Sequence, residues 1–206
     1  MGLLFRLAEL LIVIVPLVGM VVAAMRAFSA NKGPVEGSGD QAAQWRTLTR
    51  VVQEHDRTDT RWLDYELDCA KLLDFPLMTD MNNPLTVNFH KAKLRADLLR
   101  PARAEDLLDD RDAAARYLAA VEDYATAFNV AEAEAKRRRR NDFSADGQQR
   151  IGRALRLLRV ATDSAATQQE RQKAYDLARR ELDGLIVLPP TTQAGIERGI
   201  SGEIDG

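Results

Sequence analysis

Apolar side chains fill the beginning of the chain almost without interruption. No charged residue occurs from Leu10 to Met25. Strongly apolar residues each favour insertion by roughly 0.3 to 0.6 kcal/mol near the centre of a bilayer, so together they outweigh Pro16 and Gly19. The pattern predicts one transmembrane helix within an anchor of residues 1–28. The residues that we expect inside the bilayer are Leu10, Ile12, Ile14, Leu17 and Val21.

The same segment admits a second interpretation, a cleaved signal peptide. Its uncharged run is close to the upper length of a signal peptide's apolar region, and Val22-Ala23-Ala24 resembles a cleavage site. Glu9 is unusual in the basic start of a signal peptide, and Leu3 to Phe5 extend the apolar stretch backwards. We therefore favour the anchor, whose apolar helix makes the contact with membrane lipids.

Basic residues on the two sides of the predicted span indicate its orientation. Arg26 and Lys32 follow the span closely, whereas Arg6 is the only basic side chain before it. Cytoplasmic flanks carry the excess of Lys and Arg, so the count favours the C-terminal side as cytoplasmic. We expect a single-pass protein of a bacterial inner membrane, with the bulk of the chain in the cytoplasm.

Helical periodicity dominates residues 40–188, after a glycine-rich stretch at 29–39 that we interpret as a flexible linker. Residues 40–72 predict either two helices or one kinked helix. Asn83 and Pro84 are a typical N-cap and first helical residue, and they begin a helix that runs towards Arg100. Further helices are predicted at residues 112–140, 148–161 and 167–183, and Gly184 is typical of the residue that closes the last one.

Strand patterns are almost absent from the sequence. The only β-like run, Leu185 to Leu188, is short and is ended by Pro189 and Pro190. We therefore predict an all-α fold: the transmembrane helix plus a soluble antiparallel bundle of about four to six helices. Residues 189–206 are small and polar and are predicted to be a disordered tail. Alternatively, Ile196, Ile200 and Ile204 would form one stripe if this tail folded on a partner helix.

Composition narrows the class of protein. The 206 residues include 29% charged and 46% hydrophobic side chains, which is the balance of one folded domain. The net charge of −2 gives no global reason to expect nucleic acid as a partner. Cys69 is the only cysteine, so the chain forms no internal disulfide, and we interpret this residue as a small core side chain.

The sequence contains none of the common catalytic motifs. Di-iron bundles need Glu three residues before His, but Val52 and Val87 precede His55 and His90 at that spacing. Phosphate loops, HExxH, GxSxG and paired CxxC motifs are missing as well. We expect no enzyme activity and no cofactor. An enzyme would become credible again if a deep pocket held several of His55, Asp64, Glu66 and His90.

Individual polar residues also have simple structural interpretations. His55 could act as a general base, but a partly exposed helical histidine is far more common. Asp109, Asp110 and Asp112 could bind a hard cation, but acidic residues also belong in the first turn of a helix. We favour the structural interpretation for both groups.

The sharpest local feature is a run of five cations at the end of the predicted helix 112–140. They can complement the helix dipole while staying solvated. They can also contact anionic lipid headgroups, at about 1 kcal/mol each, or an acidic protein partner. RNA is disfavoured because no aromatic residues are interleaved. The run comprises Lys136, Arg137, Arg138, Arg139 and Arg140.

Residues 75–89 contain apolar side chains without helical period. Such a connection either tucks beneath the bundle or forms a docking surface, and methionines suit adaptable surfaces. We favour the buried alternative. The candidate docking residues are Phe75, Leu77, Met78 and Met81.

Together these patterns predict a membrane-tethered, non-catalytic helical scaffold or regulatory protein at a bacterial inner membrane. Its expected partners are membrane lipids, through the N-terminal helix, and a protein or a second copy of the chain. The alternative is an extracytoplasmic helical domain, anchored or secreted, that binds a cell-envelope ligand. A topology assay on the C-terminus separates the two.

Overall fold

The structure of the protein is a computed structural model that describes residues 37–202. Its contacts divide the chain into two compact units, residues 1–49 and residues 50–206. The predicted span residues Leu10, Ile12, Ile14, Leu17 and Val21, and most of the predicted linker, lie outside the described residues. Within residues 37–202, no helix combines the length and the apolar character that crossing a bilayer requires.

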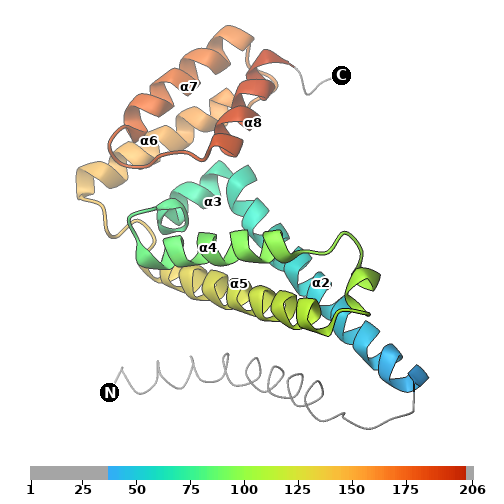
Figure 1. The fold of residues 1–206 in the computed structure, drawn as a ribbon. Helices are drawn as coiled ribbons and strands as arrows, with labels where there is room; N and C mark the ends of the chain where they lie inside the picture. Colours follow the sequence, from blue (N-terminus) through green and yellow to red (C-terminus); the bar gives the residue numbers. More distant parts are fainter. Residues whose placement is uncertain (1–36, 203–206) are drawn as a thin grey trace, which may run out of the picture. The chain divides into compact units, whose positions relative to one another are not determined.

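The described residues are all-helical, as the periodicity predicts (Figure 1). Residues 37–202 contain no strand. The α-helices are α2 (Gly37–Leu67), α3 (Cys69–Asp74), α4 (Pro84–Leu99), α5 (Arg111–Arg138), α6 (Ala145–Ala161), α7 (Gln168–Leu182) and α8 (Pro190–Ser201), with 3₁₀ turns η1 (Pro76–Thr79) and η2 (Ala104–Leu107).

Helix α2 settles the question that the sequence left open for residues 40–72. The helix runs unbroken to Leu67, and the chain then turns at Asp68 into the short helix α3. Asp68 causes this break, because its carboxylate accepts hydrogen bonds from the main-chain N–H groups of Ala70 and Lys71. The boundary therefore comes from an N-cap, and not from a kink near Thr58.

Caps predicted from the sequence also begin and end other helices. The Asn83 side chain accepts from the N–H of Leu85 and Pro84 is the first residue of α4, as expected. Asp110, which the sequence did not single out as a cap, accepts from the main-chain N–H of Ala113 at the start of α5. This supports the structural interpretation of the acidic run. Gly184 follows α7 with a φ of +71°, the left-handed conformation that glycine adopts readily.

One core of the second unit is aromatic and joins α2, α4 and α5. Helices α4 and α5 pack side by side and run antiparallel (Figure 1). The ring of Phe89 lies edge-on to Phe128 and Trp62, at centroid distances of 5.3 and 5.0 Å. Edge-to-face pairs each add about 1 kcal/mol to the gain from burial. Tyr65 and Tyr124 complete this core and are fully buried.

A second core is aliphatic and joins α3, α6, α7 and α8. Leu72 of α3 packs there with Ile151 and Leu158 of α6 and with Leu182 of α7. The capping box of Thr167 and Glu170 begins α7. Because α6 and α7 are joined by only a few residues, they pack as neighbours along their length.

Two boundaries differ from the sequence-based expectation. The prediction of a disordered tail at 189–206 is wrong for Pro190–Ser201, which forms α8. Ile196 and Ile200 are the physical reason, because both bury against the chain's own aliphatic core and not against a partner helix. Helix α2 begins at Gly37, inside the predicted linker 29–39. Residues 37–202 contain seven α-helices, more than predicted, because α3 and α8 were not anticipated.

Candidate functional site

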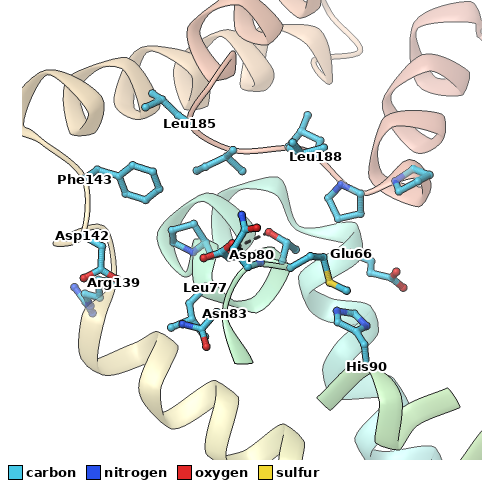
Figure 2. Close-up of a pocket in the computed structure, with 18 of the residues that line it drawn as sticks. Glu66, Leu77, Asp80, Asn83, His90, Arg139, Asp142, Phe143, Leu185 and Leu188 are labelled. Atoms are coloured by element: carbon cyan, nitrogen blue, oxygen red, sulfur yellow. Dashed lines mark hydrogen bonds between the residues drawn. The ribbon is translucent and has the colours of Figure 1, made fainter. Parts of the chain in front are cut away.

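A groove of about 760 Å³ opens in the second unit (Figure 2). Its lining comes from the end of α2, η1 with the loop behind it, α4, the loop after α5, and the connection between α7 and α8. The groove therefore lies where the aromatic and aliphatic cores meet. Its volume is within the range of sites that bind ligands or peptide side chains.

Apolar side chains make up much of the groove. Phe143 and Leu185 stand on one side in Figure 2, and Leu77 lies on the floor. Two lining residues are unusually exposed for their type: Met81 at 58% and Val187 at 82%. Apolar groups that line a concave surface and remain open to water are typical of interaction sites.

Two polar attachments hold the walls of the groove in place. The Thr192 hydroxyl donates a 2.7 Å hydrogen bond to the carbonyl of Glu66, which fixes the start of α8 against the end of α2. On the other side, Arg140 pairs with the Asp74 carboxylate and donates to the Leu73 carbonyl at 3.0 Å. This fixes the loop after α5 to the end of α3.

Charge is distributed unevenly around the groove. Glu66, Asp80 and Asp142 contribute carboxylates, whereas Arg139 is the cation among the lining residues that the structure describes. Asp142 pairs with Arg138 at 3.5 Å. In the described part of the chain, neither Glu66 nor Asp80 takes part in an ion pair. Their surroundings therefore favour a cationic ligand group.

Arg139 occupies a strained position at the rim. Its φ is +50°, a conformation that favours glycine and costs another residue about 1 to 3 kcal/mol. The guanidinium carbon lies 5.9 Å from the centre of the Phe75 ring. The strain arises where α5 ends and the chain turns towards α6.

His90 reaches the groove from α4. Its ring stands edge-on to Trp62 at a centroid distance of 5.1 Å. Burial lowers the pKa of His90 below its ordinary value of 6.5, and the nearby positive charge of Lys93 acts in the same direction. A hydrogen bond with the main chain of Met78 opposes this shift without cancelling it. The imidazole is therefore neutral at pH 7.

The candidate general base, His55, lies elsewhere and is fully buried. Its Nδ1 atom is 3.0 Å from the Tyr117 hydroxyl and its Nε2 atom is 3.1 Å from Oδ1 of Asp97. A carboxylate only accepts hydrogen bonds, so Nε2 carries the hydrogen. The expectation of partial exposure was wrong, because α2 turns this face towards α4 and α5. Both ring nitrogens are engaged within the fold.

His55, Asp59 and Asp97 place one ligand atom each within 4.8 Å of one another, which is a spacing that a metal ion could use. The ammonium of Lys93 already lies between the two carboxylates, 2.9 Å from Asp59 and 3.0 Å from Asp97. Arg100 adds a second cation at 3.3 Å from Asp59. A metal ion would have to displace Lys93, so we interpret the cluster as structural.

Most of the basic run pairs with the chain itself. Lys136 lies 3.0 Å from Glu132, and Arg137 and Arg138 both bind Glu134, at 2.7 and 2.5 Å. These bonds lower the pKa of Glu134 to about 2. Contact with anionic lipid stays a prediction, but the pairing reduces the charge that the run offers to a surface.

The predicted docking segment is divided between core and groove. Met78 is fully buried and Leu77 nearly so, whereas Phe75 is half-buried and Met81 is exposed. Leu77 and Met81 line the groove. Burial of Met78 and Leu77 agrees with the alternative that we favoured, a satellite of the core.

Sequence reasoning missed the other half of the groove. Of the four residues named for a possible enzyme site, Glu66 and His90 line the groove, whereas His55 and Asp64 are not among the described lining residues. Val187 was not anticipated as a site residue. The signal for it was the short β-like run before Pro189, which is neither helical nor paired as a strand.

Comparison with protein-family models, with curated proteins and with solved structures gives no match for this chain.

Proposed function

We propose that this chain is a membrane-tethered, non-catalytic helical scaffold that binds a protein partner in the groove. The observation that carries the proposal is the groove itself, whose apolar lining includes the exposed side chains of Met81 and Val187. An apolar surface with a few polar groups at its edges is how proteins recognise one another. The tether is the predicted helix within residues 1–28.

The polar clusters support a binding role over catalysis. His55 is buried with both nitrogens hydrogen bonded, and Lys93 is paired with both carboxylates beside it. In the groove, His90 is held against Trp62 and is neutral. General base catalysis needs such a group to be within reach of a nucleophile, and here the side chains are committed to packing.

Site-specific photo-crosslinking in the native bacterial host tests the binding role. A benzophenone amino acid is placed in the full chain at Val187 or Met81, inside the groove, or at Leu98 of α4 as a matched exposed control. We expect one discrete crosslinked protein from both groove positions and none from Leu98. Crosslinks from Leu98 alone, or from none of the three, would overturn the proposal.

Membrane attachment is tested separately on the same cells. We expect the chain to remain in the membrane pellet after carbonate extraction, and a C-terminal alkaline phosphatase fusion to be inactive because the bulk faces the cytoplasm. An active fusion would favour the extracytoplasmic alternative. Release of a shortened chain by carbonate would show that the N-terminal segment is cleaved.

A further inference from the structure

The connection between α7 and α8 forms one edge of the groove, and its side chains alternate. Leu185 and Ile186 both pack against the aliphatic core, Val187 is 82% exposed and Leu188 is 5% exposed, so the alternation runs from Ile186 to Leu188. Alternation from one face to the other is the signature of extended backbone. The segment lies outside both helices, and Figure 1 shows it running as an open connection between them.

The main chain of this segment has unused hydrogen-bonding groups. The N–H of Ile186 donates to the Leu182 carbonyl, and the Leu188 carbonyl accepts from Nε2 of Gln193. Between these two bonds, Val187 makes no hydrogen bond with any residue that the structure describes. Pro189 has no N–H to donate. Val187 therefore presents one donor and one acceptor, as an edge strand does.

The charges of the groove indicate which charged side chains a partner's strand would carry. Glu66 lies at the end of the groove with His90, and Arg139 and Asp142 lie at the other end (Figure 2). The Glu66 carboxylate accepts from the Thr191 hydroxyl at 3.2 Å, which leaves its negative charge uncompensated within the described part of the chain. In the described part of the chain, the Asp80 carboxylate accepts one hydrogen bond, from the main-chain N–H of Asn82.

We propose that the groove binds an extended segment of its protein partner by strand addition to Val187. The partner's apolar side chains lie against Leu77 and Phe143, and a lysine or arginine of the partner lies beside Glu66 and Asp80. This inference rests on the proposed function and specifies the partner. Main-chain hydrogen bonds give affinity in this mode of binding, and the side-chain contacts give specificity.

Charge argues against a second copy of this chain as the occupant. The same segment of another copy, Leu185 to Pro190, carries no basic side chain that could lie beside the carboxylates of Glu66 and Asp80. A basic partner segment is attracted by both of these carboxylates. A partner strand also satisfies the donor and acceptor of Val187, which a purely apolar ligand leaves unpaired.

Fluorescence anisotropy with labelled synthetic peptides tests the proposal on the full chain in neutral lipid nanodiscs, with empty nanodiscs as the blank. The probes are heptapeptides of alternating valine and lysine, the same peptide with glutamate for lysine, and the lysine peptide with its three central amides N-methylated. We expect the lysine peptide to bind at least about tenfold more tightly than either of the others. Because N-methylation changes only the probe, protein folding does not affect this comparison.

Protein variants locate the binding site. Val187→Pro removes the N–H and should weaken binding by about tenfold, whereas Val187→Ala keeps the N–H and should bind within about threefold of the wild type. The double substitution E66Q/D80N should weaken the lysine peptide by about tenfold. The control E105Q/D109N removes the same charge from exposed residues outside the groove and should have little effect.

Intrinsic fluorescence adds a direct reading at the groove. Trp45→Phe leaves Trp62, which lines the groove, as the only tryptophan. Its emission should change on adding the lysine peptide. Equal binding of the lysine and glutamate peptides, full binding of the N-methylated probe, or unchanged Trp62 emission at saturation would each overturn strand addition. Crosslinking at Val187 in cells tests the proposed function independently of these peptide experiments. If strand addition were overturned while the crosslink was found, the proposed function would stand without this binding mode.

Discussion

The Tyr65 hydroxyl donates a 3.0 Å hydrogen bond to Oε1 of Glu132, although 67 residues separate them in the chain. The other oxygen of Glu132 accepts from Arg61 at 2.6 Å. Burial raises the pKa of Tyr65, and the charge of Glu132 raises it further, so the hydroxyl remains a donor at neutral pH. This bond fixes the end of α2 against α5, at the residue directly before the groove residue Glu66.

Removing this acceptor should destabilise the fold. Glu132→Ala leaves the buried Tyr65 hydroxyl without its partner, so we expect the free energy of unfolding to fall by about 2 kcal/mol in urea denaturation followed by circular dichroism. Glu134→Ala is the control, because its partners Arg137 and Arg138 lie at the surface, where ion pairs contribute little. Equal losses in the two variants would contradict the prediction.

The pH dependence of the same variant has a defined sign. Burial alone would raise the pKa of Glu132, but hydrogen bonds and charge from Lys136 and Arg61 together lower it below 4.5. Its contribution is therefore present above that pH and is lost as the pH falls through the folded value. The stability difference between wild type and Glu132→Ala should narrow in acid.

His90 should titrate below its ordinary value of 6.5, because burial disfavours its charged form. A folded pKa lower than the unfolded one makes stability fall as the pH drops below 6.5, until the folded pKa is reached. We expect the imidazole resonance of His90 in NMR to move at a lower pH than that of a model peptide. The free energy of unfolding should change less between pH 7 and pH 5 in His90→Asn than in the wild type. The same pH profile in both proteins would contradict this prediction.

Lys93 should exclude divalent cations from the cluster of His55, Asp59 and Asp97. We expect zinc not to bind this cluster in the wild type, because the Lys93 ammonium already bridges the two carboxylates. The melting temperature of the wild type should therefore stay unchanged when zinc is added. Lys93→Ala should melt at a lower temperature and should regain stability when zinc is added. Zinc stabilisation of the wild type that is lost in His55→Ala would show that the metal displaces Lys93.

Gly184 and Gly195 form a matched pair for backbone effects. A Cβ atom at either position would meet nothing within 4 Å, but only Gly184 has a positive φ, of +71°. Gly184→Ala should therefore cost about 1 kcal/mol through conformation alone. Gly195→Ala, within α8, should stabilise by about 0.5 kcal/mol, because alanine restricts the unfolded chain. Thermal unfolding of the two variants should shift in opposite directions.

Local sequence patterns predicted most of the helices, because neighbouring residues decide where those helices begin and end. The cap at Asn83 with Pro84, and the end of α7 at Gly184, depend on residues within one turn of the boundary. The same reasoning failed for α8, since its glycines disfavour a helix by propensity. Burial of Ile196 and Ile200 against α6 and α7 outweighs that preference, and no local pattern contains this contact.

The candidate site illustrates the same division. The sequence singled out Leu77 and Met81 as exceptions to helical period, and the run before Pro189 as β-like. It could not bring them together, because residues 77 and 187 line the same groove only after two cores have packed. The burial of His55 likewise depends on Tyr117 and Asp97, which lie far along the chain.

The amino-acid sequence by itself determined the helical class, the principal caps and the character of the apolar N-terminal segment, because these follow from periodicity and residue type over short distances. Only the tertiary structure decided that four of the five cations in the basic run pair with the chain itself, that Lys93 fills the acidic cluster, and that a groove forms beside Val187. Those features depend on contacts between residues far apart in the chain, where packing decides which polar groups find partners and which stay open to a ligand.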